Sequence, residues 1–436
     1  MGAYLSQPVI DKESSTGRST THAWGCSSMQ GWRKHMEDSH ITISNLGGKF
    51  AGIACFGVFD GHGGREVAQF CRHYLPDEIR RQLLSIGEKE SALGSSALFG
   101  KALKQGFHAM DDMLRSPEHE RMILAFKQGG AADLTGDSSS SSSKASPSTA
   151  DMLSTVDVDA DETDSNASSG DEETAVGVEA QNQGSKGNHY SKPTVLSLLQ
   201  TSISTDLAQA RNRGSLKKEE AAQVMMKMAL LRKLESQAPL DNADAGIVDN
   251  VGCTAVCILL TEQEVVCANA GDSRSILCRN GRPIELSHDH KPNHKTESDR
   301  IEAAGGRVET VSVGTRVQYR INGNLNVSRA IGDHEYKKRP ELGHEKQMIC
   351  STPDIVTVPL TQEDEFVVLA CDGVWDVKTN QEVCDFVRPR LMQGEDTSKI
   401  VEMLLDNCVA ADPKENHGLG GDNMTCIIVQ LQHRTD

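Results

Sequence analysis

The stretch IACFGVFDGHG, residues 53–63, places an aspartate and two glycines directly after a run of apolar residues. Apolar residues without alternation are typical of a strand that is buried on both faces, so we expect a strand over Phe50 to Asp60. Gly61 lets the backbone turn sharply where that strand ends. Taken alone, Asp60-Gly61 is equally an ordinary turn, and this stretch leaves both interpretations open.

The same pattern returns twice in distant parts of the chain. Asp372 follows a second apolar run, and Asp422 comes shortly before a third, while Glu37 and Asp38 lie together near the N-terminus. Hard divalent cations such as Mg²⁺ and Mn²⁺ prefer carboxylate and water oxygens. The sequence therefore predicts carboxylates from several strands gathered in one metal-binding cleft.

Hydrophobic periodicity predicts the remaining elements. Helices are expected at 63–84, 95–114, 382–391 and 397–409, a helix ending at 300–304, and strands at 254–260, 264–270, 274–278, 366–370 and 425–431. Between them, residues 129–191 are rich in Ser, Asp, Glu and Gly, a composition that cannot bury enough apolar surface to fold. We therefore divide the chain into an N-terminal segment (1–21), a folded domain (22–115 and 246–436) and an acidic, Ser-rich insertion (116–245). The insertion is expected to be largely disordered, with a helix at 221–234.

Composition narrows the class of protein. The 436 residues include 45 Lys and Arg against 62 Asp and Glu, a formal charge of −17 that argues against nucleic acid as a partner. No apolar run reaches the ~20 residues of a membrane span, and the start lacks a secretory signal, so we expect a cytoplasmic or nuclear protein. The 12 cysteines lie largely in apolar runs without zinc spacing.

The first six residues match the pattern for N-myristoylation of Gly2. Gly2 is otherwise simply a small second residue. A single acyl chain binds membranes weakly and reversibly, so any membrane association through it would be weak.

Eight motifs carry a family resemblance, and they occur in the family's order. They are SMQGWR (28–33) with MED (36–38), DGHGG (60–64), GCTA (252–255), AGDSR (270–274), DHKP (289–292), VSRAIGD (327–333), ACDGVWD (370–376) and DNM (422–424). The chain resembles the metal-dependent serine/threonine protein phosphatases of type 2C, the PPM family, over residues 22–115 and 246–432. The alpha-type members of animals and protists are the most similar.

The resemblance implies a fold and an activity. The fold is α+β, with two antiparallel β-sheets packed as a sandwich, helices on both sides (αββα) and the metals at one end. The activity is hydrolysis of phosphoserine and phosphothreonine in proteins, dependent on two central Mg²⁺ or Mn²⁺ ions and a weaker third, without a phospho-enzyme. Phosphoproteins are the implied partners, and a monomer is the implied state.

Site residues follow from the same resemblance. Asp60, Asp372 and Asp422 would hold the two central ions, with the Gly61 carbonyl as a further ligand and Glu37 reached through water. A hydroxide between the two ions would then attack phosphorus.

Two cationic side chains complete the implied reaction. Arg33 would clamp the phosphate, because its guanidinium fork matches two phosphate oxygens; otherwise it is a surface charge. His62 would protonate the leaving serine or threonine oxygen, since histidine titrates near neutral pH. Its alternative is a turn residue or a partner that orients Asp60.

Three further aspartates, Asp272, Asp38 and Asp376, have roles around the central ions or in the local structure. Asp272 would hold the third ion together with Asp372, or would only form a turn. Asp38 is expected to orient ligands or water, and Asp376 either does the same or caps a helix. His288, His290 and His294 are interpreted as residues of a loop.

Two rival classes remain. A binding protein with the phosphatase fold but no turnover would normally have lost one of the predicted ligands, and all are present. A hydrolase of nucleotides or nucleic acids disagrees with the acidic balance and with the ordered motifs. For the insertion, phosphorylation, binding of basic proteins and simple spacing all remain open.

Overall fold

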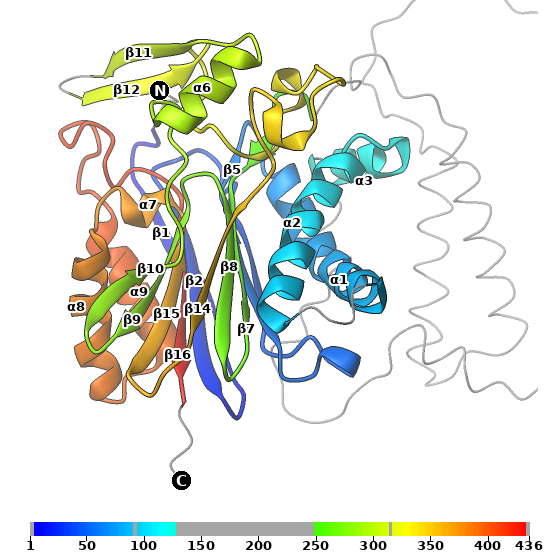
Figure 1. Cartoon of the computed structure of the whole chain (residues 1–436). Coiled ribbons are helices and arrows are strands. Elements are labelled where there is room, and N and C mark those ends of the chain that lie inside the picture. The colour runs from blue at the N-terminus through cyan, green and yellow to red at the C-terminus, as the bar shows by residue number, and fades with distance from the viewer. Residues whose placement is uncertain (1–3, 90–93, 128–247, 314–315, 433–436) are drawn as a thin grey trace, which may run out of the picture. The chain divides into compact units, whose positions relative to one another are not determined.

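Two antiparallel sheets packed face to face form the centre of the computed structural model, which describes residues 4–89, 94–127, 248–313 and 316–432 (Figure 1). The first sheet contains, in spatial order, β1 (Val9–Arg18), β2 (His22–Gly31), β16 (Met424–Leu431), β15 (Asp364–Ala370), β9 (Arg274–Arg279) and β10 (Arg282–Glu285). The second contains β14 (Asp354–Pro359), β8 (Glu264–Ala270), β7 (Ala255–Leu260), β4 (Ala54–Phe59) and β3 (Ser39–Ile43).

Helices cover both outer faces of the sandwich (Figure 1). The second sheet is covered by α1 (Glu66–Lys89), α2 (Ser95–Met113) and α3 (Pro117–Lys127), and the first by α8 (Asn380–Met392) and α9 (Thr397–Cys408). Three hydrophobic layers result, one between the sheets and one under each set of helices. The predicted αββα fold class is confirmed.

Strand β4 shows why its sequence is apolar throughout. Phe56 and Val58 pack into the layer between the sheets, whereas Cys55 and Phe59 face the helices. A strand buried on both faces needs no polar alternation. The predicted start at Phe50 is wrong, because Gly48–Phe50 forms the 3₁₀ helix η1.

The first helix also begins later than predicted. Gly63 and Gly64 have φ angles of 74° and 152°, which a right-handed helix does not allow, so α1 starts at Glu66 and runs on to Lys89. Of the predicted insertion, the structure describes α3, whose Ile123 and Phe126 join the core. The predicted helix at 221–234 and Gly2 lie outside the described residues.

Several elements were not predicted from the sequence. Strand β1 is largely exposed at the edge of its sheet, so its sequence carries little hydrophobic signal. A small sheet joins β13 (Ile331–Gly332), β6 (Gly252–Cys253) and β5 (Gly61–His62). Beside α6 (Lys295–Ala303), a two-stranded ribbon is formed by β11 (Val308–Val313) and β12 (Arg316–Ile321), and 3₁₀ helices follow as η3 (His334–Tyr336) and η4 (His344–Lys346).

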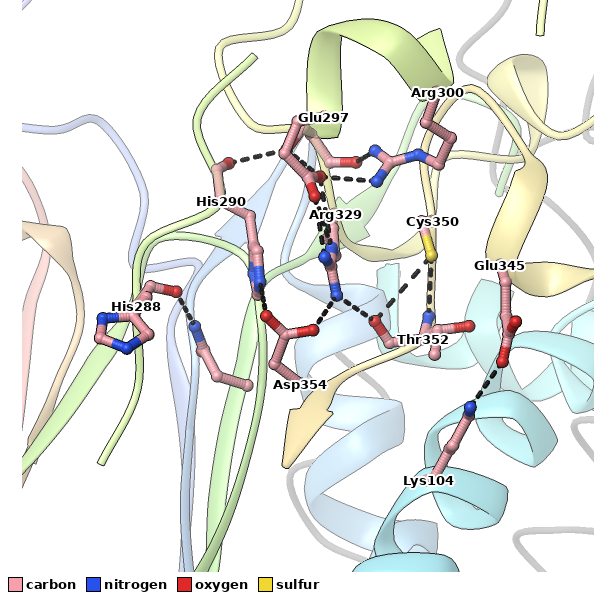
Figure 2. Close-up of polar contacts among 12 residues, drawn as sticks. Lys104, His288, His290, Glu297, Arg300, Arg329, Glu345, Cys350, Thr352 and Asp354 are labelled. Atoms are coloured by element: carbon pink, nitrogen blue, oxygen red, sulfur yellow. Dashed lines mark hydrogen bonds and ion pairs between the residues drawn. The ribbon is translucent and has the colours of Figure 1, made fainter. Parts of the chain in front are cut away.

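A set of paired charges, here called the anchor network, ties α6 to the sandwich (Figure 2). It consists of His290, Glu297, Arg300, Arg329 and Asp354. The buried Glu297 carboxylate accepts from Arg300 Nη1 at 2.6 Å and from Arg329 Nη2 at 2.8 Å. Arg329 also donates to Asp354, at the start of β14, and Asp354 hydrogen bonds with His290 Nε2 at 3.0 Å. His290 is therefore a buried structural contact as well as a loop residue.

Candidate metal centre

Five aspartates gather at one end of the sandwich because the strands that carry them end there. Asp60 follows β4, Asp272 lies between β8 and β9, and Asp372 is the first residue of the short helix α7 (Asp372–Trp375), directly after β15. Asp422 precedes β16, and Asp38 precedes β3. This carboxylate cluster, as we call it, consists of Asp38, Asp60, Asp272, Asp372 and Asp422.

The members of the carboxylate cluster repel one another. Burial, followed by the charges of Asp372, Asp38 and other members, raises the pKa of Asp60 well above its usual value. Burial and the charges of Asp422 and Asp272 do the same for the pKa of Asp372. Burial likewise raises the pKa of Asp38 to about 7. Like charges in one site disfavour joint ionisation unless a cation compensates them.

Two basic side chains reach the cluster from within the chain. Arg33 Nη2 forms an ion pair with Asp422 Oδ2 at 2.5 Å, and about half of the Arg33 side chain stays exposed. Burial alone would lower the pKa of Arg33, but Asp422, Asp372 and Asp60 raise it. Lys291 is paired with the buried Asp272. The described contacts thus supply two positive charges for five carboxylates.

Two glycines let the backbone segments of the site approach closely. A Cβ on Gly61 would clash with the carbonyl oxygen of Glu37, and a Cβ on Gly373 would clash with that of Asn423. The turn after β4 therefore lies directly against the segment that contains Glu37 and Asp38. The start of α7 lies against the Asp422-Asn423 turn in the same way.

Asn423 joins the loops of the site. Its side-chain oxygen accepts from Glu37 N at 2.9 Å, and its amide nitrogen donates to the carbonyl oxygens of Gln30 and His35. No role was predicted for Asn423, although it stands beside Asp422 in the sequence. Its position after an acidic residue in a tight turn was the available signal.

The donor set fits a hard divalent cation. Asp38 Oδ2 accepts from Thr425 Oγ1 at 2.7 Å, but the buried Asp38 Oδ1 has no N–H or O–H donor among the described residues. One carboxylate oxygen of Asp38, one of Asp60 and Cys371 Sγ lie within 4.8 Å of one another. Burial keeps the pKa of Cys371 well above its usual value, so the thiol is neutral and carboxylate oxygens are the available ligands.

The other predicted site residues lie around this cluster. Burial raises the pKa of Glu37, whose charged neighbours include Arg33 and His62. Asp376 is exposed and follows the last residue of α7 as its C-cap. His62 Nε2 hydrogen bonds with Asp333 Oδ2 at 2.7 Å, a contact that no local pattern in the sequence indicated.

Comparison with known proteins gives one consistent family. A family model described as "Protein phosphatase 2C" matches residues 23–135 and 145–417. Probable protein phosphatase 2C 11 of Oryza sativa subsp. japonica is 33% identical over 432 residues, which cover 99% of this chain and 91% of that protein. Protein phosphatase ppm-1.G of Caenorhabditis elegans is 32% identical over an alignment of 515 positions, covering 100% of both chains.

Solved structures agree in fold. The crystal structure of serine-threonine phosphatase 2C from Toxoplasma gondii superposes with a TM-score of 0.55 at 17% identity, covering 99% of both chains. At this identity the likeness concerns the fold alone. The family assignment rests on the family model and on the relatives from Oryza sativa and Caenorhabditis elegans.

Proposed function

The chain belongs to the protein phosphatase 2C family of metal-dependent serine/threonine protein phosphatases, and we propose that it works with two central Mg²⁺ or Mn²⁺ ions. Such a pair of ions supplies a water of lowered pKa that attacks phosphorus directly, without a phospho-enzyme. Its substrates are phosphoproteins.

Within this proposal, each residue of the carboxylate cluster has a part. Asp60, Asp372 and Asp422 hold the two central ions, together with the Gly61 carbonyl and, through water, Glu37. Asp272 and Asp372 hold a weaker third ion, and Asp38 orients the ligands or water beside Asp60. Asp376, exposed after α7, orients water at the margin of the site.

Two side chains handle the substrate in this proposal. Arg33 binds the phosphate, which agrees with its half-exposed guanidinium beside Asp422. A planar guanidinium can bind two phosphate oxygens at once. His62 donates a proton to the leaving serine or threonine oxygen, and its side chain is partly exposed at the site.

One observation supports the metal centre above all others. Burial and the charge of Asp372 raise the pKa of Asp60, and burial and the charges of Asp422 and Asp272 raise the pKa of Asp372. Arg33 and Lys291 are the described bases paired with the cluster. Cations are the compensation that such a site needs in order to stay ionised at neutral pH.

Hydrolysis of a phosphothreonine peptide tests the proposal. We expect turnover with Mn²⁺, none with EDTA, and a loss on the order of 10³-fold in Asp60→Asn, because a ligand to the ions is removed. Asp11→Asn, on the exposed strand β1, is the matched control and should retain full activity. Calorimetry should show weaker Mn²⁺ binding in Asp60→Asn and unchanged binding in Asp11→Asn. Full metal-independent turnover, or none in the unmodified chain despite Mn²⁺ binding, would contradict the proposal.

Further parts of the proposal concern the whole molecule. We propose a monomer in the cytoplasm or nucleus, with a weak membrane attachment if Gly2 is acylated, and closest kinship to the alpha-type members. No described helix has the length and apolar character needed to cross a membrane. Size-exclusion chromatography with light scattering and mass spectrometry of the N-terminal peptide test the state of assembly and the acylation.

A further inference from the structure

We propose that Asp333 is a positioning residue, which holds the His62 ring so that its other nitrogen faces the leaving oxygen. The inference rests on the phosphatase function proposed above and on His62 as the acid. His62 Nε2 lies 2.7 Å from Asp333 Oδ2. The Asp333 side chain is 2% exposed against 25% for His62, so Asp333 cannot reach a substrate and acts through the ring.

The small sheet brings this pair together. Its central strand β6 places Gly252 opposite His62 on one side and opposite Gly332 on the other. A Cβ on Gly252 would clash with Asp333 Oδ2 and lie 2.7 Å from His62 Nε2. The contact therefore passes directly over a residue that has no side chain. A larger residue at position 252 would push the carboxylate and the imidazole apart.

The backbone at Asp333 is held in an uncommon conformation. Its φ angle is 52°, in the left-handed region, where residues other than glycine are strained. The Asp333 amide donates to Val251 O at 3.0 Å. Such strain persists only where the surroundings fix the conformation, and here it directs the side chain toward His62.

Helix α2 supplies further support for the segment that carries Asp333. Asp111 Oδ1 accepts from Gly332 N at 2.9 Å and from Lys337 Nζ at 2.6 Å. Asp111 and Lys337 are both buried. Asp111 therefore holds the chain at Gly332 and at Lys337, on either side of Asp333, and these buried contacts limit the movement of Asp333, as positioning of a catalytic ring requires.

The chemistry assigns one task to each ring nitrogen. With Nε2 bound to Asp333, Nδ1 is the nitrogen left to donate. As the water oxygen forms its bond to phosphorus, the bond to the serine or threonine oxygen breaks. That oxygen takes the proton from His62 Nδ1, and the proton lost by the water restores His62. A carboxylate on the opposite nitrogen fixes ring orientation and tautomer in the same way in other histidine-dependent enzymes.

Leaving groups of different basicity test the proposal. Asp333→Asn should lower kcat for a phosphothreonine peptide by roughly 10–100-fold, within the range for general acid catalysis. For p-nitrophenyl phosphate, whose leaving group departs without a proton, kcat should change by less than about threefold. Gly252→Ala, which forces the pair apart, should show the same selectivity. Calorimetric Mn²⁺ affinity of both variants should match that of the unmodified chain and of the control Asp11→Asn.

A double variant separates positioning from general structural damage. His62→Gln combined with Asp333→Asn should be no slower on the peptide than His62→Gln alone, because Asp333 acts through the ring. Equal losses on both substrates, additive losses in the double variant, or unchanged peptide turnover would each overturn the proposal. An unmodified chain that hydrolyses neither substrate with Mn²⁺ would instead remove the phosphatase function itself.

A measurement on the unmodified protein does not depend on folding of a variant. Long-range ¹⁵N–¹H correlation spectra of ¹⁵N-histidine-labelled protein report which ring nitrogen carries the proton, and His62→Gln identifies the signal by its loss. We expect the neutral ring of His62 to carry its proton on Nε2, toward Asp333. A neutral ring protonated on Nδ1 would refute the arrangement.

Discussion

The anchor network and the carboxylate cluster each include a buried carboxylate, Glu297 and Asp272 respectively, yet the two sets shift the pKa values of their carboxylates in opposite directions. In the anchor network, burial would raise the pKa of Glu297, but Arg329, Arg300 and Ser328 lower it to about 2 (Figure 2). In the carboxylate cluster, burial and like charges raise the pKa of Asp60 and Asp372 well above normal. The arginines of the chain itself compensate the carboxylates of the anchor network, whereas the carboxylate cluster needs bound cations for compensation.

This contrast separates structural from functional charge. A buried carboxylate with guanidinium partners stabilises the fold only as long as each partner is present. A buried carboxylate among other carboxylates destabilises the metal-free fold and gains its benefit on binding a cation. Removing one charge from each set should therefore have opposite effects on stability and on activity.

The largest effect is expected in the carboxylate cluster. Asp372→Asn should lower phosphopeptide turnover on the order of 10³-fold, about 4 kcal/mol of barrier, because Asp372 is a proposed ligand to the central ions. The same substitution should leave the metal-free protein equally or more stable, since it removes repulsion from Asp422 and Asp272. Urea unfolding in EDTA gives the stability. If Asp372→Asn lowered the free energy of unfolding as much as disrupting the anchor network does, the proposed distinction between the two sets of charges would be wrong.

The anchor network should respond in the reverse manner. Glu297→Gln should lower the free energy of unfolding by about 3 kcal/mol, because it leaves buried guanidinium groups without their carboxylate. Calorimetric Mn²⁺ affinity should not change, since the contacts of Glu297 lie outside the carboxylate cluster. Asp354→Asn is the matched control: its side chain is 53% exposed and accepts from the same Arg329, so its cost should be about 1 kcal/mol or less. An equal decrease in the free energy of unfolding for Glu297→Gln and Asp354→Asn would contradict the claim that burial of the carboxylate makes the ion pair stabilising.

The sequence predicted these two regions to very different degrees. Asp60, Asp372 and Asp422 were expected to gather in one cleft because each stands near an apolar run, and the family resemblance named them as ligands. The anchor network joins Glu297 to Arg329 and Arg329 to Asp354, across spacings of 32 and 25 residues. No short-range pattern indicates such pairs.

The same limit applies to His62. Its family motif suggested a role, but its partner Asp333 lies 271 residues away in the chain. Only the pairing of β5, β6 and β13 brings the two side chains together. Strand β1 was missed for another reason, because it is largely exposed and its sequence carries little apolar signal. In β12, Val317, Tyr319 and Ile321 alternate with polar residues, so there a strand pattern was present but was not predicted.

The comparison also predicts opposite responses to pH. Asp38 has a pKa of about 7 in the fold against 3.8 when unfolded, so between these values the folded protein binds the extra proton. Stability of the metal-free protein should then fall as the pH rises, by about 2 kcal/mol from pH 5 to pH 7. Glu297, with a folded pKa of about 2 against 4.5, adds stability above pH 4.5 and loses it as the pH falls toward 2.

Urea unfolding at several pH values isolates the contribution of Asp38. The unmodified chain and Asp38→Asn are compared in EDTA, so that the contributions of titrating groups outside the carboxylate cluster cancel. The difference in slope between pH 5 and 7 should disappear when Mn²⁺ is added, because a bound cation keeps the carboxylates ionised. An identical slope in both proteins without metal would show that Asp38 is not held among uncompensated charges.

The smallest effect is expected where charges are paired but exposed. Lys104 Nζ lies 2.5 Å from Glu345 Oε1, beside the anchor network, with side chains 40% and 59% exposed (Figure 2). Lys104→Ala should change the free energy of unfolding by less than about 0.5 kcal/mol, and less still at high salt, because water screens the pair. Glu345→Gln and the double variant complete a thermodynamic cycle for the pair. A coupling energy above about 2 kcal/mol would mean that proximity alone, rather than burial, makes the anchor network stabilising.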